Sequence, residues 1–181
     1  YFWVRAICSD QTRSEWSQPI DFYTGYCVGN SSMNVYIRAI RTTGDFTNLD
    51  YYTLTRPENN YADLTRSQVL TLRAGGSGTI YFENNQSATR SAFLWVDWNQ
   101  NMVFDYQELL LNFNQSINAP LTIPANTPPG RYRVRMVSFQ SNSQNRSMVY
   151  NLCSTNALYS IVDFTLVVEQ PCSVPTARME G

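Results

Sequence analysis

The chain has 181 residues, of which 15% are charged, and a formal net charge of −1. This near-neutral balance argues against the strongly positive field that attracts nucleic acids and anionic membranes, so we expect no nucleic-acid partner and no membrane insertion. The sequence contains no His, and all thirteen basic residues are Arg, which removes the usual proton shuttle and the amine nucleophile, so we expect that the protein is not an enzyme.

The first 24 residues predict two strands joined by a polar turn. Asp10 and Ser14 lie in the turn, and the second strand follows Pro19. Two strands cannot bury a core on their own. We therefore expect this segment to belong to a separate domain.

Residues 26–170 predict an all-β domain. Short apolar and β-branched runs alternate with Gly, Pro, Asn and Ser, which is typical of strands joined by polar turns. The Gly-rich segment 74–78 predicts a hairpin or a loop, because glycine adopts positive φ easily. Strands are expected at residues 31–40, 51–55, 69–72, 79–82, 93–98, 121–123, 131–137 and 161–168. The architecture we expect is an antiparallel, jelly-roll-like β-sandwich.

Two of these strands carry the strongest patterns. The strand expected at residues 93–98 begins with a continuous apolar run, residues 93–96, as expected of a central strand that is covered on both faces. Residues 131–137 alternate strictly, which places Tyr132, Val134 and Met136 on one face and three Arg residues on the other. We expect this second strand to be half-buried.

Oxygen-bearing side chains recur in residues 97–108. Counted from residue 97, they occupy positions one, three, five, nine and twelve, which is the spacing of a calcium-binding loop. Met102 stands where such loops usually have Gly, so the alternative is a polar hairpin loop with Asx turns that needs no ion. With position seven included, the candidate calcium ligands are Asp97, Asn99, Asn101, Val103, Asp105 and Glu108.

The same region offers candidate ligand-binding side chains. Arg131, Arg133 and Arg135 are expected either to hold an anionic glycan or protein partner through bidentate contacts, or to pair with acidic residues of a neighbouring strand. Trp98 and Tyr106 are expected either to stack on a sugar or to pack in the core.

The four cysteines are far apart in the sequence, at Cys8, Cys27, Cys153 and Cys172. This spacing favours disulfide bonds in an oxidising compartment over a zinc site. We therefore expect a secreted or cell-surface protein, with its export signal outside this segment.

Both ends of the sequence resemble fibronectin type III domains. The family's Y-x-V-R-A strand is matched by Tyr1, Trp3, Arg5 and Ala6. Residues 14–17 (SEWS) match its S-x-W-S turn, and residues 171–176 (PCSVPT) resemble the opening of another such domain. The resemblance implies that residues 1–25 end one such domain and residues 171–181 begin the next. It also implies partners for Cys8 and Cys172 outside this segment, although a bridge between the two is the alternative.

Residues 26–170 resemble the GEVED domain family. The matching segments are LWVDWNQNMVFDYQELL (94–110), IPANTPPGRYRVRM (123–136) and YSIVDFTLVV (159–168). The family's closing strand reads Gly-Glu-Val-Glu-Asp-Tyr-Thr, and this chain keeps Asp163 and Thr165 but neither Glu. An ion site or ligand surface built on those glutamates would be absent here.

The GEVED resemblance also implies a disulfide between Cys27 and Cys153, which match the family's cysteines by position. Such domains are β-sandwich binding or adhesion modules that occur beside fibronectin-like modules in large secreted bacterial surface proteins, often exported by the type IX pathway. We therefore expect an adhesive or structural module, and the alternative is a carbohydrate-binding accessory domain of a secreted hydrolase. The expected partners are the flanking domains of the same chain and surface glycans or other surface proteins.

Overall fold

The computed structural model describes residues 3–7, 12–18, 25–29, 31–32, 34–44, 46–86, 90–113, 117–140 and 159–169. Within these ranges the regular structure is β-strand, apart from two short 3-10 helices, η1 (Glu58–Asn60) and η2 (Tyr106–Glu108). No helix among the described residues is long and apolar enough to cross a membrane. The predicted all-β class is confirmed.

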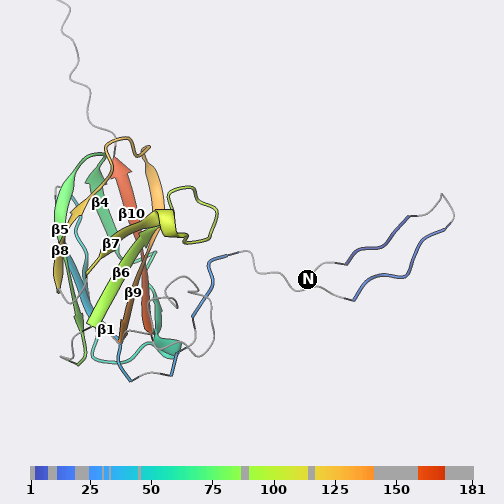
Figure 1. Ribbon diagram of the computed structural model, residues 1–181, viewed down its shortest axis with the longest axis horizontal. Coiled ribbons are helices and arrows are strands. Elements are labelled where there is room, and N and C mark those ends of the chain that lie inside the picture. Colours follow the sequence, from blue (N-terminus) through green and yellow to red (C-terminus); the bar gives the residue numbers. More distant parts are fainter. Residues whose placement is uncertain are drawn as a thin grey trace, which may run out of the picture.

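The described strands form two sheets that pack face to face as a sandwich (Figure 1). The first sheet has the order β2-β1-β5-β8, with β1 (Ile37–Thr43), β2 (Asp50–Tyr52), β5 (Ser77–Asn84) and β8 (Asn118–Thr122). The second has the order β3-β10-β9-β6-β7, and β4 also pairs with β10. Its strands are β3 (Tyr61–Asp63), β4 (Val69–Arg73), β6 (Arg90–Val96), β7 (Leu109–Asn112), β9 (Gly130–Gln140) and β10 (Tyr159–Glu169).

The main core lies between the two sheets and follows the predicted alternation. Tyr132, Val134 and Met136 of β9 all lie in this core, together with Ile40 and Phe82 from the opposing sheet. Each of these side chains is at least nine-tenths buried. The alternation of β9 therefore orients the strand. The strand is not half-buried as expected, however, because Arg135 and Val137 on its other face are also buried.

The outer face of the second sheet is buried as well. A second cluster on this face contains Phe93, Trp95, Val137, Phe139, Tyr159 and Ile161, and Phe104 packs against it. The stacked rings of Phe93 and Phe139 lie 5.1 Å apart. β6 lies between β9 and β7 and is buried on both faces, which confirms the prediction from its continuous apolar run.

One expectation about strand pairing is corrected. β10 pairs in parallel with both β3 and β4, so the second sheet is mixed rather than antiparallel. Of the two connections predicted for the Gly-rich segment, the structure has the loop, because β4 and β5 lie in different sheets. The loop covers residues 74–76, since β5 begins at Ser77. Gly75 in this loop has φ of +73°, and its N–H donates to the carbonyl of Ile123 at 3.1 Å.

The first strand of the sandwich begins later than predicted. Residues 34–36 are held by the side chain of Asn85, which donates to the carbonyl of Asn34 and accepts from the N–H of Tyr36, both at 3.0 Å. The N–H of Asn85 also donates to the carbonyl of Tyr36 at 3.0 Å, so side-chain bonds stand beside a single backbone bond where a regular ladder would continue. β1 therefore begins at Ile37.

Near the start of the chain two short segments run antiparallel, and the second of them contains Ser14, which was expected in the turn. The strand expected after Pro19 lies outside the described residues. Ile7 and Arg13 form a bridge, and the N–H of Ser17 donates to the carbonyl of Val4 at 2.8 Å. Figure 1 shows this hairpin apart from the sandwich. Its fibronectin-like identity and the domain boundaries stay predictions, and residues 171–181 lie outside the described residues.

Candidate functional site

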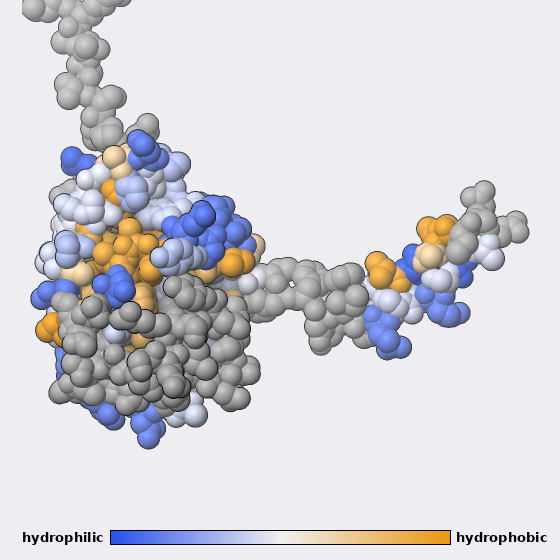
Figure 2. All heavy atoms as spheres, viewed as in Figure 1, coloured by the Kyte–Doolittle hydropathy of each residue, from blue (hydrophilic) through white to orange (hydrophobic). Residues whose placement is uncertain are grey.

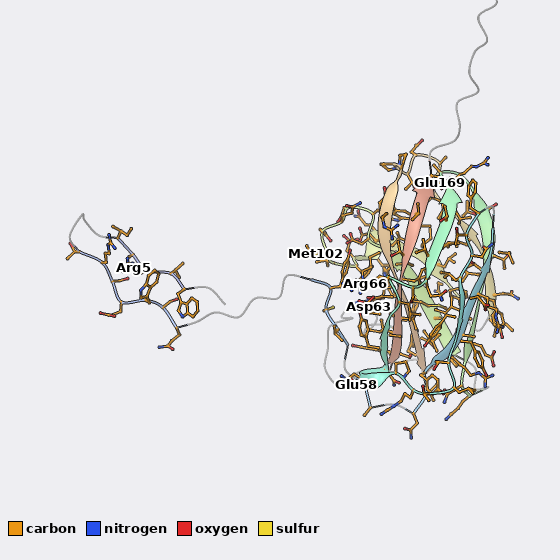
Figure 3. All side chains as sticks on the ribbon, turned by 180° about the vertical axis from the view of Figure 1, so that it is seen from behind. Arg5, Glu58, Asp63, Arg66, Met102 and Glu169 are labelled. Carbon is orange, nitrogen blue, oxygen red and sulfur yellow. The ribbon has the colours of Figure 1, made fainter. Side chains whose placement is uncertain are left out.

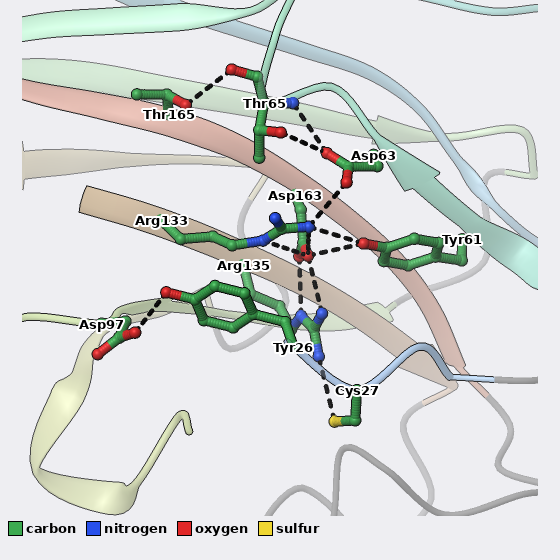
Figure 4. Close-up of polar contacts among 10 residues, drawn as sticks. All are labelled: Tyr26, Cys27, Tyr61, Asp63, Thr65, Asp97, Arg133, Arg135, Asp163 and Thr165. Atoms are coloured by element: carbon green, nitrogen blue, oxygen red, sulfur yellow. Dashed lines mark hydrogen bonds and ion pairs between the residues drawn. The ribbon is translucent and has the colours of Figure 1, made fainter. Parts of the chain in front are cut away.

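Asp163 on β10 lies at the centre of a buried group of charges (Figure 4). Arg135 of β9 is directly opposite it in the strand register, and neither side chain is exposed. Nε of Arg135 donates to Oδ1 of Asp163 at 2.8 Å, and Nη2 donates to Oδ2 at 2.7 Å. This bidentate geometry is the strongest form of an Arg–carboxylate pair.

Arg133 adds a second cation on the same face of β9. Its Nε and Nη2 donate to Oδ2 of Asp163 at 2.9 and 2.8 Å. Nη2 also donates to Asp63 of β3 at 3.0 Å and to the hydroxyl of Tyr61 at 2.8 Å, and that hydroxyl donates to Asp163 at 3.0 Å. The group therefore ties β3, β9 and β10 together through side chains as well as through the backbone.

The protonation behaviour of this group follows from burial and charge. Burial, and then the charge of Asp163, raise the pKa of Tyr61 far above its ordinary value of 10.0. Burial would lower the pKa of Arg133, but Asp163 raises it above its ordinary value. Burial would raise the pKa of Asp63, but hydrogen bonds from Thr65 and Arg133 lower it below its ordinary value. At neutral pH the two arginines, Arg133 and Arg135, are therefore paired with the carboxylates of Asp163 and Asp63.

Residues 97–103, which follow β6, are held by their own side-chain oxygens. Oδ1 of the fully buried Asp97 accepts the N–H of Asn101 at 3.2 Å, and Oδ2 accepts the N–H of Met102 at 3.0 Å. Oδ1 of Asn99 accepts the N–H of Asn101 at 2.9 Å, and Oδ1 of Asn101 accepts the N–H of Val103 at 2.8 Å. The bonds of Asn99 and Asn101 are Asx turns, in which a side chain satisfies the backbone two residues further on, whereas Asp97 reaches four and five residues ahead.

Glu108 closes the same loop from its other end. Its Oε1 accepts the N–H groups of Trp98 and Asn99 at 3.0 and 3.3 Å, and its Oε2 accepts the N–H of Asp105 at 3.3 Å. Asp105 in turn accepts from the N–H of Gln107, which completes a capping box on η2. Burial raises the pKa of Glu108, although the backbone donors oppose the shift.

The loop geometry bears on the predicted calcium ligands. In Asp97, Asn99, Asn101, Asp105 and Glu108, side-chain oxygens already accept backbone N–H groups, so the arrangement is that of the alternative with Asx turns. Among the described residues no three His, Cys, Asp or Glu side chains form a group that could hold a metal ion. As arranged, these donors do not fit calcium, and ion binding stays a prediction.

Tyr26 connects this loop to the charged group, and sequence reasoning missed it. Its hydroxyl donates to Oδ2 of Asp97, the guanidinium of Arg133 lies 4.5 Å from its ring centroid, and the ring of Phe104 lies 5.2 Å away. Burial and the hydrogen bond to Asp97 raise the pKa of Tyr26 well above its ordinary value. Its place directly before Cys27, a cysteine that matches the GEVED pattern, was the available signal.

The predicted ligand-binding residues separate into buried and accessible ones. Arg135 is fully buried, so it is withdrawn as a ligand-binding residue, and it pairs with Asp163 as the alternative expected. Trp98 packs edge-on against the ring of Tyr132 at 5.2 Å. Tyr106 is 66% exposed, and Arg131 is also exposed. Figure 2 shows the hydrophilic surface that the loop presents beside a hydrophobic area of the sandwich.

The cysteines are tested only in part. The Nη1 atom of Arg135 lies 3.6 Å from Sγ of Cys27, which places this cysteine beside the charged group. Cys8, Cys153 and Cys172 lie outside the described residues. The pairing of Cys27 with Cys153 therefore stays a prediction.

These features define a β-sandwich module whose charged side chains mostly hold its own backbone and one another. The GEVED domain family model matches residues 91–166. This stretch runs from β6 into β10 and contains the loop, Arg133, Arg135 and Asp163. No curated protein matches the chain. The resemblance to the GEVED family is thus supported over these residues.

Proposed function

We propose that this chain is a non-catalytic structural and adhesive module of a large secreted or cell-surface protein. One observation carries the proposal: the most deeply placed charged side chains, Asp97, Glu108, Arg135 and Asp163, are all used to hold backbone or one another. Groups held in this way resist deformation, because moving any of them leaves a buried polar atom unsatisfied. Such bracing suits a link that carries load between neighbouring domains.

The proposed disulfide between Cys27 and Cys153 fits the same role. Cys27 lies beside the charged group, where residues 25–29 reach the second sheet. A bridge closing so long a loop stabilises the folded state by about 4 to 5 kcal/mol in the chain-entropy model. Under force the bridge would also keep the residues between the two cysteines closed, so that only the short segments outside it could extend.

Single-molecule pulling tests this proposal. The module is placed between marker domains and stretched from its two ends, with and without a reductant. With the bridge intact, the residues between Cys27 and Cys153 stay closed, and reduction releases roughly 125 further residues at about 3.5 Å each, or about 44 nm. A Cys153→Ser variant should give the long extension without a reductant. A module that extends in small steps at low force would contradict a load-bearing role.

A second candidate function, a carbohydrate-binding accessory domain, rests on the exposed ring of Tyr106. This ring is 66% exposed at η2, beside the polar loop, and exposed aromatic rings are suited to stacking on sugars. Trp98→Ala would not test this function cleanly, because Trp98 packs against the main core. A glycan array probed with the native chain and with Tyr106→Ala does so: a signal that Tyr106→Ala abolishes, at unchanged melting temperature, would favour this function.

A further inference from the structure

An open polar cleft lies where five segments of the chain meet. Its volume is about 260 Å³, and its lining residues are Tyr26, Thr65, Gln100, Arg131, Tyr132, Arg133 and Thr165. These come from residues 25–29, the turn after β3, the loop after β6, and strands β9 and β10. Figure 3 shows Asp63, Arg66 and Met102, which are close in sequence to lining residues, on one side of the sandwich.

The two arginines of the cleft differ in how far their charge and hydrogen-bond donors are already used. The lining contains two arginines and no carboxylate. Arg133 is neutralised by Asp163 and Asp63, and its Nε and Nη2 atoms are engaged. Arg131 is exposed, and no ion pair joins it to an acidic side chain among the described residues. Its guanidinium is therefore available for a bidentate contact with a carboxylate.

The other polar groups of the cleft all keep an acceptor oxygen, and Gln100 also keeps one N–H donor. The hydroxyl of Thr165 donates to the carbonyl of Thr65 at 2.8 Å, and the hydroxyl of Thr65 donates to Asp63 at 2.6 Å. The amide nitrogen of Gln100 donates to the carbonyl of Arg131 at 3.5 Å, which leaves its amide oxygen. Each of these groups keeps an oxygen that can accept a hydrogen bond.

This combination selects the chemistry of a ligand. A ligand that matches it carries a carboxylate for Arg131 and several hydroxyl groups to donate to the acceptors. An Asp or Glu side chain of a protein partner would supply the carboxylate but no hydroxyl donors. The cleft is slightly smaller than the usual range of ligand pockets, about 300 to 1,000 Å³, so it suits a single sugar residue.

We propose that this cleft binds one acidic sugar residue, of the uronic-acid class, in a surface glycan, with its carboxylate on Arg131. This inference rests on the proposed adhesive function and names its partner. The pulling experiment above does not involve Arg131, so either proposal can fail while the other stands.

The test titrates the chain with methyl glucuronoside and, as the neutral counterpart, methyl glucoside, followed by NMR chemical shifts. The glucuronoside is expected to bind at least about tenfold more tightly than the glucoside, because a hydrogen bond to a charged group is worth about 1.5 to 3 kcal/mol. Arg131→Gln should weaken glucuronoside binding by a similar factor. The control, Arg41→Gln, removes another exposed arginine, which lies on β1 in the other sheet, and should leave binding unchanged.

Several outcomes would overturn the proposal. Equal weakening by both substitutions would indicate a diffuse charge effect and no site. Binding of a short polyglutamate as tight as that of the glucuronoside, with the same loss in Arg131→Gln, would assign the cleft to an acidic protein. No shift with the glucuronoside at millimolar concentration would also refute it. Melting curves must match the native curve within about 2 °C, which the exposure of Arg131 leads us to expect.

Discussion

Replacing Asp163 with Asn removes the negative charge that two arginines share. The Asp163 side chain is fully buried and accepts four hydrogen bonds from Arg133 and Arg135 and one from Tyr61. Asn keeps the shape of Asp, but its amide group would face the arginine donors with donors of its own. Arg135, also fully buried, would then keep a charge with no partner.

The cost follows from the burial of both partners. Five charge-assisted bonds counted separately at about 1.5 to 3 kcal/mol each would rival the stability of a whole domain, so that sum overstates the effect. Removing one partner of a buried pair costs about 3 to 5 kcal/mol, because the other charge stays desolvated. In a domain of this size, that corresponds to a melting temperature roughly 6 to 20 °C lower.

Urea unfolding followed by tryptophan fluorescence measures this loss. The matched control is Asp50→Asn, which breaks an exposed pair with Arg41 at 3.2 Å and should cost less than about 1 kcal/mol. A double variant, Arg135→Met with Asp163→Leu, removes both buried charges and should regain part of the stability. The reasoning is refuted if Asp163→Asn destabilises the chain no more than Asp50→Asn does.

Three further predictions concern single groups. Tyr26→Phe should lower the free energy of unfolding by about 1.5 kcal/mol, because a buried carboxylate loses a hydroxyl donor. The control, Tyr52→Phe at an exposed ring, should change it by less than about 0.5 kcal/mol. Equal losses in the two variants would contradict the role of the Tyr26 hydroxyl. Tyr26 and Tyr61 have raised pKa values, so their contribution to stability is complete below pH 10 and is lost as the pH rises beyond it; ultraviolet titration should show both ionising after the exposed tyrosines, and simultaneous ionisation would contradict this. Gly78→Ala should lower the free energy of unfolding by about 1 to 3 kcal/mol, because its new carbon would lie 2.0 Å from a backbone oxygen of β1. Gly130→Ala meets ordinary contacts and should leave the free energy of unfolding nearly unchanged in the same urea assay.

The strands that were predicted well are those whose own residues define a face. The alternation in residues 131–137 predicted which side of β9 enters the main core, because a period of two separates apolar from charged side chains. It did not predict that the charged face is buried too. The apolar run in residues 93–96 likewise predicted a strand covered on both faces. Both predictions used information that lies within a single strand.

Pairing between distant strands was predicted poorly. The parallel pairing of β10 with β3 and β4 joins segments about a hundred residues apart, and no local pattern specifies it. For residues 74–78 the sequence left a hairpin and a loop open, because glycines suit either connection. Whether this connection is a hairpin or a loop depends on which sheet each flanking strand joins.

The sequence predicted many of the residues of the candidate site but not which of them contact one another. The oxygen spacing of residues 97–108 was visible in the sequence, but the backbone groups that those oxygens bind depend on the folded loop. Asp163 had a signal in the sequence, since it is a single acidic residue in an apolar strand and pairs with the strand that carries alternate arginines. Tyr26 had a much weaker one, because its partners Asp97 and Arg133 are far away in the sequence.

Amide hydrogen exchange in the 97–108 loop tests most directly whether its charged side chains brace the backbone. The N–H groups of Asn99, Asn101, Met102 and Asp105 are bound to side-chain oxygens of the loop, so we predict slow exchange in a chelator and no change on adding millimolar calcium. Glu108→Gln should speed exchange at Asn99 and Asp105. Rapid exchange in the chelator, with protection appearing only when calcium is added, would contradict the account.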